Sequence, residues 1–225
     1  MKEINAIITG ASGMVGDGVL HQCLHNPDVK SVLVVNRKSI GITHPKLKEI
    51  ILSDFFKVDE IKEQLKGYNA CYFCLGVSSL DFKEAEYTKL TYDLTLNFAK
   101  AVSSVNSDMT FCYVSGAGTD STEQGKSMWA RVKGKTENDL RKLPFKQVYN
   151  FRPAGMIPFL QLKPSQKFYS AYKYIGWLMP IVEKIAPNMV IPLLDLANAM
   201  IKVTQVGYDK HNIEMKDIRI IAKQK

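Results

Sequence analysis

The residues best suited to bind a ligand stand near the start of the chain. Gly10, Gly13 and Gly16 follow an apolar run that predicts a buried strand, and they open a segment with the apolar spacing of a helix. Such glycines let the backbone turn sharply and approach a pyrophosphate, which the free N–H groups of the helix N-terminus hold. The stretch therefore predicts a dinucleotide-binding loop, with a tight turn without a ligand as the alternative. Its expected contact residues are Thr9, Gly10, Ser12, Gly13, Met14, Val15 and Gly16.

The residues after the second predicted strand bear on which dinucleotide is bound. That strand covers 31–36 and ends about twenty residues after the loop, where an NAD enzyme carries Asp or Glu for the ribose 2′-hydroxyl. Arg37 and Lys38 follow instead. A guanidinium fork and an ammonium suit a 2′-phosphate, so the sequence favours NADP over NAD. The alternative is that both are ordinary exposed basic residues.

Two other spacings suit a metal, but nothing around them supports one. Cys71 and Cys74 have the spacing of a redox or zinc pair, yet they fall in a strand-like run without a second pair. His21 and His25 are one helical turn apart, and no third ligand follows at a useful spacing. We therefore expect no metal and interpret the cysteines as buried hydrophobes. Cysteines of this kind, without a signal-peptide pattern before the first strand, predict a cytosolic protein.

The composition limits the class of partner. The chain has 225 residues with 30 Lys or Arg and 22 Asp or Glu, a net charge of +8, which would suit nucleic acid or an anionic membrane. The basic residues are spread along the chain without a nucleic-acid-binding motif, and charges and prolines interrupt the apolar stretch 176–194. We expect a small-molecule substrate, no nucleic acid and no membrane. A homo-oligomer or a regulatory protein partner stays open.

Strand and helix patterns alternate through the first 150 residues. This rhythm predicts an α/β fold, a Rossmann-type doubly wound parallel sheet, in a single domain of residues 1–225. We expect 1–153 to form the cofactor-binding core and the proline-rich 154–225 to form a small substrate-side region that does not fold independently. Strands are predicted at 4–8, 31–36, 49–52, 70–75, 110–115, 147–151 and 212–215, and helices at 15–24, 58–65, 83–105, 129–142, 166–174, 176–185, 193–206 and 218–222.

Taken in order, these stretches resemble the atypical short-chain dehydrogenase/reductases, and in particular the oxidoreductases similar to the Tat-interacting protein. The resemblance implies a Rossmann fold with a pyridine nucleotide under the glycine loop and Asp54 near its adenine. It also implies that Cys74, Leu75 and Gly76 line the cofactor, and we count Arg152 and Pro153 among the cofactor-binding residues. The matching stretches cover about two thirds of the chain: 9–16, 36–37, 53–54, 74–76, 115–118, 132–134 with Glu137, and 151–153.

The resemblance further implies catalytic roles. In that superfamily a Ser after the fifth strand orients the substrate carbonyl, a Tyr exchanges the proton, and a Lys four residues on lowers the pKa of the Tyr and holds the nicotinamide ribose. Ser115 and Lys133 match two of these positions, and Trp129 occupies the third. An indole N–H donates a hydrogen bond but does not ionise at neutral pH. A carbonyl reductase without its Tyr should be slower by about 10²- to 10⁴-fold unless another group substitutes.

A second Tyr-x-x-x-Lys pattern occurs at 169–173, beyond the sixth predicted strand, and we interpret it as a chance match. For Tyr169, Tyr172 and Tyr174 we favour aromatic packing on a short helix; the alternative is that one of them reaches the cleft from the substrate side and supplies the proton. Three functions follow from the sequence. The first is an NADP-dependent oxidoreductase acting on a small carbonyl or alcohol. The alternatives are a catalytically silent NADPH-binding regulatory or sensor protein and, with less support, an enzyme like the nucleotide-sugar epimerases.

Overall fold

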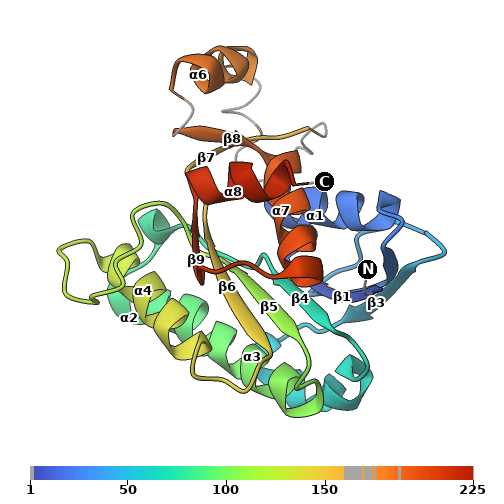
Figure 1. The fold of residues 1–225 in the computed structure, drawn as a ribbon. Coiled ribbons are helices and arrows are strands. Elements are labelled where there is room, and N and C mark those ends of the chain that lie inside the picture. Colours follow the sequence, from blue (N-terminus) through green and yellow to red (C-terminus); the bar gives the residue numbers. More distant parts are fainter. Residues whose placement is uncertain (1–2, 160–168, 170–173, 175, 187–188, 225) are drawn as a thin grey trace.

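The computed structural model describes residues 3–159, 169, 174, 176–186 and 189–224. Its centre is a seven-stranded parallel sheet in the order β3-β2-β1-β4-β5-β6-β9, with helices on both faces (Figure 1). The order reverses between β1 and β4, which is where a ligand crevice forms in open α/β sheets. The predicted doubly wound α/β fold is confirmed. The strands are β1 (Ile4–Thr9), β2 (Val29–Asn36), β3 (Leu47–Ile51), β4 (Ala70–Phe73), β5 (Thr110–Val114), β6 (Gln147–Arg152) and β9 (Asn212–Glu214).

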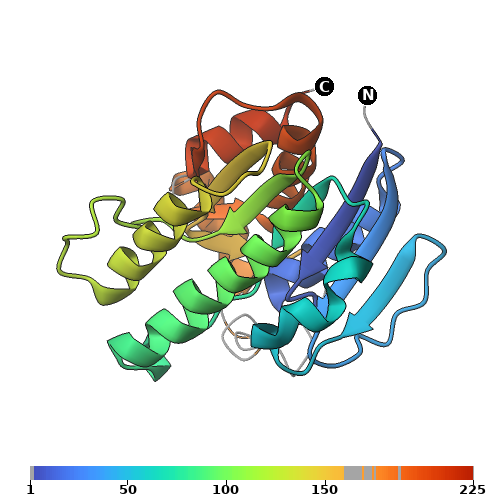
Figure 2. The ribbon, with the colours of Figure 1, turned by 90° about the horizontal axis from the view of Figure 1, so that it is seen from below.

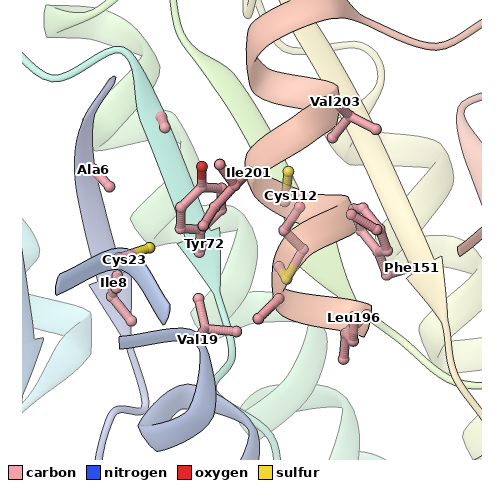
Figure 3. Packing of buried hydrophobic residues seen from close by; sticks show 14 of the residues in the cluster. Ala6, Ile8, Val19, Cys23, Tyr72, Cys112, Phe151, Leu196, Ile201 and Val203 are labelled. Carbon is pink, nitrogen blue, oxygen red and sulfur yellow. The ribbon is translucent and has the colours of Figure 1, made fainter. Parts of the chain in front are cut away.

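The central strands are apolar along their length because helices cover both faces of the sheet. In β2, Val32 and Val34 belong to the core on one face, and Leu33 and Val35 to the core on the other. Figure 3 shows the first core, in which side chains of the helices pack on Tyr72 and other strand residues. This two-sided burial explains why runs of β-branched and aromatic residues predicted the strands.

Two layers of helices form the faces. One layer consists of α1 (Met14–His25), α7 (Leu193–Val206) and α8 (Met215–Ala222). Figure 2 shows the other face. On this face the helix η1 (Phe55–Leu65) begins three residues before the predicted helix, because the Asp54 carboxylate accepts a hydrogen bond from Phe56 N at 2.9 Å. The predicted helix 83–105 contains a π-helical segment, η3 (Lys89–Asp93). The second layer comprises η1 (Phe55–Leu65), η2 (Ser79–Asp81), α2 (Glu84–Thr88), η3 (Lys89–Asp93), α3 (Leu94–Val105) and α4 (Met128–Leu140).

The residues after 153 divide between two places in the fold. A small parallel pair, β7 (Gly155–Ile157) and β8 (Val190–Pro192), lies with η4 (Gly176–Leu178) and α6 (Met179–Ile185) apart from the main sheet (Figure 1). The segments α7, β9 and α8 belong to the main body, with β9 paired to β6 and α7 against α1. Residue 153 is therefore no spatial boundary. None of the helices among the described residues is long and apolar enough to cross a membrane.

Candidate active site

The three loop glycines meet different surroundings. Gly10 has φ +71°, and a Cβ there would lie 2.8 Å from the Cys74 carbonyl oxygen. A Cβ on Gly16 would lie 2.2 Å from the Gly10 carbonyl oxygen. At Gly13 the one neighbour within 4 Å is that same oxygen, at 3.4 Å. The protein's own backbone therefore requires glycine at 10 and 16, whereas glycine at 13 keeps open a space that faces a cavity.

Buried polar atoms at the base of the loop support a polar ligand there. Thr9 Oγ1 and Asn36 Nδ2 are buried and have no hydrogen-bond partner among the described residues. Asn36 Oδ1 accepts a hydrogen bond from Ala11 N at 3.2 Å, which ties β2 to the loop. A buried polar atom without a partner costs about 1–3 kcal/mol, and such atoms often mark a site that a ligand or water completes. The loop therefore fits a dinucleotide pyrophosphate.

A cavity of about 200 Å³ lies beyond β2 and β4. Arg37 and Asp54 stand on its polar wall, and Leu75 and Gly76 also line it, together with aromatic and aliphatic side chains such as Phe55. This mixture suits an adenosine, with a guanidinium available for a phosphate. The structure thus brings together the two residues predicted at the adenosine end. Lys38 is exposed and does not line this cavity.

A larger cavity, of about 500 Å³, joins the loop to the predicted catalytic residues. Gly13, Met14 and Val15 line one end, and Ser12 is exposed beside them. The segment 74–76 after β4 forms a wall, and Val114 and Met156 supply apolar surface. Ser115, Trp129 and Lys133 line the same cavity, whose volume is in the range typical of small-molecule sites.

The hydroxyl of Ser115 is engaged by a buried carboxylate. Its Oγ lies 2.5 Å from Glu137 Oε1 and 3.1 Å from the Phe151 carbonyl oxygen. Glu137 is fully buried and is paired with Arg152, whose Nε lies 3.0 Å from Oε1 and whose Nη2 donates to Oε2. An ionised carboxylate only accepts hydrogen bonds, so the serine is the donor. Ser115 therefore offers the cavity lone pairs rather than a hydrogen, which differs from the role that the resemblance implies.

Lys133 lies one helical turn before Glu137 on α4. Its Nζ donates a hydrogen bond to the Ser115 carbonyl oxygen. Burial lowers the pKa of the Lys133 ammonium to about 8, and the Glu137 carboxylate offsets part of the shift. One turn earlier, the Trp129 ring lies 3.4 Å from the position that a Cβ on Gly118 would take. Trp129, Lys133 and Glu137 are spaced four residues apart, so they lie on one side of α4, beside the residues that follow β5.

Two predicted cofactor ligands lie elsewhere. Besides Glu137, Arg152 donates to Glu214 Oε1 at 3.0 Å and to Ser121 Oγ at 2.5 Å, and it lines neither of the two cavities described above. The Pro153 carbonyl oxygen accepts a hydrogen bond from Ala117 N at 2.9 Å. These contacts hold the loop after β5 against β6. Arg152 turns inward because the buried carboxylate needs a cationic partner.

The tyrosine that lines the large cavity is not one of those that the sequence singled out. Tyr174 is 73% exposed, and Tyr172 and Lys173 lie outside the described residues. Tyr87, which the sequence did not single out, lines the large cavity and is 1% exposed. Sequence reasoning also missed the contact of Glu137 with Ser115. Its position four residues after Lys133 was the available signal.

The cysteines are free thiols, and Cys23, Cys71 and Cys112 are buried. Figure 3 shows Cys23 and Cys112 in the first core. Burial raises the pKa of Cys71 and Cys112 well above the usual range, so both stay protonated. The rings of His21 and His25 stack with centroids 4.1 Å apart. Among the described residues, no three His, Cys, Asp or Glu side chains gather as a metal site would require.

Several known proteins are similar to this chain, although no family model matches it. The protein from Debaryomyces hansenii named Protein FMP52, mitochondrial, is 27% identical over 156 residues, which cover 68% of this chain and 67% of that protein. The Candida albicans protein of the same name is 26% identical over 158 residues, 68% of each chain. Because these relatives are named mitochondrial, the expected cytosolic location is wrong. Reduced, buried cysteines do not distinguish the cytosol from other compartments that keep thiols reduced.

Solved structures extend the likeness over most of the chain. The Bordetella bronchiseptica enzyme WbmF in complex with NAD⁺ matches with a TM-score of 0.66 at 15% identity, over 98% of this chain and 77% of that one. A UDP-N-acetylglucosamine 4-epimerase from Methanobrevibacter ruminantium matches with a TM-score of 0.64 at 16% identity, over 94% and 76%. A short chain dehydrogenase family protein from Francisella tularensis matches with a TM-score of 0.62 at 17% identity, over 91% and 92%. The chain therefore has the Rossmann-type fold that these proteins share.

Proposed function

We propose that the protein is an NADP-dependent oxidoreductase of the atypical short-chain dehydrogenase/reductase type, which interconverts a small carbonyl compound and its alcohol. The observation that carries this proposal is the cavity that runs from the glycine loop to Ser115 and Lys133. Solved structures of the same fold include an enzyme with bound NAD⁺ and a uronate dehydrogenase. Because a fold hosts many functions, the contents of the site carry the argument and the likeness adds to it.

Different residues would bind the two parts of the cofactor, its pyrophosphate and its adenosine. The loop around Gly13 and the N-terminus of α1 would hold the pyrophosphate. Arg37 would pair with the 2′-phosphate, while Asp54 and Gly76 would line the adenosine cavity. When bound, the reduced nicotinamide supplies a hydride to the carbonyl carbon. The chain itself supplies the walls that position the carbonyl, through Trp129 and Met156 among others.

A second candidate is an NADPH-binding regulatory protein without catalysis. Two observations favour it. Trp129 occupies the position of the usual proton-exchanging Tyr, and the Ser115 hydrogen is engaged by Glu137. In this alternative the cavity would still bind the cofactor, but no carbonyl compound would be reduced.

The test combines cofactor binding with turnover. For the wild type and for Gly13→Val we measure NADPH binding by the fluorescence of NADPH. For both we also measure the oxidation of NADPH in the presence of a panel of small aldehydes, ketones and enones. We expect NADPH binding and turnover in the wild type. Gly13→Val should stay folded, because its Cβ meets one protein atom at 3.4 Å, but it should lose binding because the side chain fills the ligand space.

Gly176→Val is the matched control, since a Cβ at Gly176 has no neighbour within 4 Å among the described atoms and the residue lies in η4, outside the loop. It should bind NADPH as the wild type does. Wild-type affinity in Gly13→Val would mean that the loop is only a turn. Tight NADPH binding without turnover of any panel member would favour the regulatory protein.

A further inference from the structure

The wall of the large cavity carries one charged side chain among the described residues that line it, Lys133. Its ammonium is anchored on the Ser115 carbonyl oxygen, and Nζ lies 4.0 Å from the position that a Cβ on Gly116 would take. An ammonium carries three hydrogens, and the anchor uses one of them. The other two remain for a group in the cavity.

Other proton donors in the wall are less suited to the chemistry. Ser115 gives its hydrogen to Glu137. The Trp129 indole does not ionise at neutral pH. The phenol of Tyr87 lines the cavity from α2, but burial raises its pKa. Burial also raises the pKa of the Cys74 thiol to about 12. These groups hold their protons at neutral pH.

The groups around Lys133 come from three further elements. Glu137 lies on the same helix, and Arg152 of β6 holds that carboxylate in place. Cys74 follows β4, and Tyr87 belongs to α2. Against this background burial lowers the pKa of Lys133 to about 8, and Glu137 offsets part of the shift. An acid with a pKa near the working pH transfers protons most efficiently.

We propose, on the basis of the proposed function, that Lys133 itself is the proton donor and replaces the absent Tyr at the Trp129 position. In reduction, the carbonyl carbon would gain a hydride with its electron pair from bound NADPH, which is oxidised to NADP⁺, and the C–O π bond breaks toward oxygen. That oxygen takes one proton from the Lys133 ammonium and forms the O–H bond. The resulting neutral amine recovers a proton from water. Glu137 and Arg152 act as positioning residues, because they fix Ser115 and through it the ammonium.

The first test exchanges the side chain while keeping its charge. Lys133→Arg retains a cation, but a guanidinium does not release its proton in proteins. We expect NADPH affinity within about threefold of the wild type and kcat lower by about 10²- to 10⁴-fold, the usual contribution of general acid catalysis. Lys133→Ala should be equally slow, and added ethylamine should restore part of its rate. Lys135→Met, on the same helix with an exposed side chain, should match the wild type.

The second test does not depend on activity. Acetic anhydride acylates a free amine but not an ammonium, so the labelling of Lys133 in the wild type, followed by mass spectrometry of its peptide, reports deprotonation. We expect labelling to rise with pH around a midpoint of about 8. In parallel, kcat for carbonyl reduction should fall as the pH rises through the corresponding value in the complex, because the ammonium is the required form.

Each failure has a distinct meaning. A wild type that binds NADPH and reduces no panel member would refute the proposed function, and the role of Lys133 with it. An active wild type together with an equally fast Lys133→Arg would refute the role of Lys133 alone. So would a Lys133 amine that stays unlabelled up to pH 10. Loss of kcat in Lys133→Ala that ethylamine does not restore, with a matching loss of NADPH affinity, would assign Lys133 to cofactor binding instead.

Discussion

The buried pair of Glu137 and Arg152 supports a prediction about stability. The carboxylate is fully buried and the guanidinium side chain is 10% exposed. Removing one partner of such a pair costs about 3–5 kcal/mol, because it leaves a charge without compensation. Glu137→Met leaves Arg152 with Glu214, whose side chain is 50% exposed, so we expect the lower end, about 3 kcal/mol. For a chain of this length that corresponds to a fall in Tm of roughly 6–12 °C.

The double variant Glu137→Met with Arg152→Met separates charge from packing. Replacing a buried ion pair with apolar residues of similar volume is often neutral, and Ser115 keeps the Phe151 carbonyl oxygen as acceptor at 3.1 Å. We therefore expect the double variant to be more stable than either single variant. Arg152→Met alone should be more damaging than Glu137→Met, because it leaves a fully buried carboxylate without its cation, whereas Glu137→Met leaves Arg152 paired with Glu214.

The assay is urea and thermal unfolding at pH 7, followed by circular dichroism and analysed as a double-mutant cycle. Lys30→Met serves as the control, since the pair of Lys30 with Glu3 is 2.9 Å long but 64% and 67% exposed. Exposed pairs contribute about 0–1 kcal/mol. Two results would refute the assignment of a buried, coupled pair. One is a double variant whose loss of unfolding free energy equals the sum of the two single losses. The other is a single variant that loses less than about 1 kcal/mol, which is the contribution of an exposed pair.

Two further predictions concern the cofactor and the proton. At equal concentration NADPH should raise Tm more than NADH, because we expect Arg37 to pair with the 2′-phosphate. The effect is measurable, since ligand at 100 times its Kd stabilises the folded protein by about 2.7 kcal/mol. Arg37→Ala should remove most of that difference and Lys38→Ala little of it, because Arg37 lines the adenosine cavity and Lys38 does not; equal effects of the two cofactors in the wild type would contradict the NADP assignment. Trp129→Tyr should raise carbonyl reduction, by at most about 10²- to 10⁴-fold in the chemical step, because it adds a phenol one turn before Lys133. Stopped-flow oxidation of NADPH checks this, and a slower variant would mean that the indole packed over Gly118 matters more than a second acid.

Local pattern was sufficient for most of the fold. The apolar spacing of 193–206 predicted a helix with the bounds of α7, because that helix buries one continuous face that includes Leu196, Met200 and Val203. The first strand and the loop after it were equally predictable, since a buried parallel strand is apolar on both faces. The pairing of β7 with β8 was not, because it joins Gly155 to Val190 and no local pattern encodes a contact of that sequence separation.

The same limit applies to the site. The sequence identified Ser115 and Lys133 as candidates, but the donor direction of Ser115 depends on Glu137 of another element. Arg152 was counted as a cofactor ligand because it stands in one of the stretches, 151–153, that carry the family resemblance. Its actual partners are set by the charge that lies buried beside it. Predicting that contact from sequence requires knowing how α4 is rotated against β6.

The residue spacing in α4 nevertheless shows which side chains share one side of the helix. Trp129, Lys133 and Glu137 follow one another at intervals of four residues, so they occupy one side of the helix. On that side an ordinary helix packed on a sheet would carry apolar residues, and a half-buried lysine and a buried glutamate there cost stability. Chains retain such departures from local rules mainly at functional sites. Lys135 and Asp139 form a pair at the same spacing on a more exposed side of α4, so the spacing alone does not identify the site. The partial burial of Lys133 and the full burial of Glu137 distinguish the two pairs.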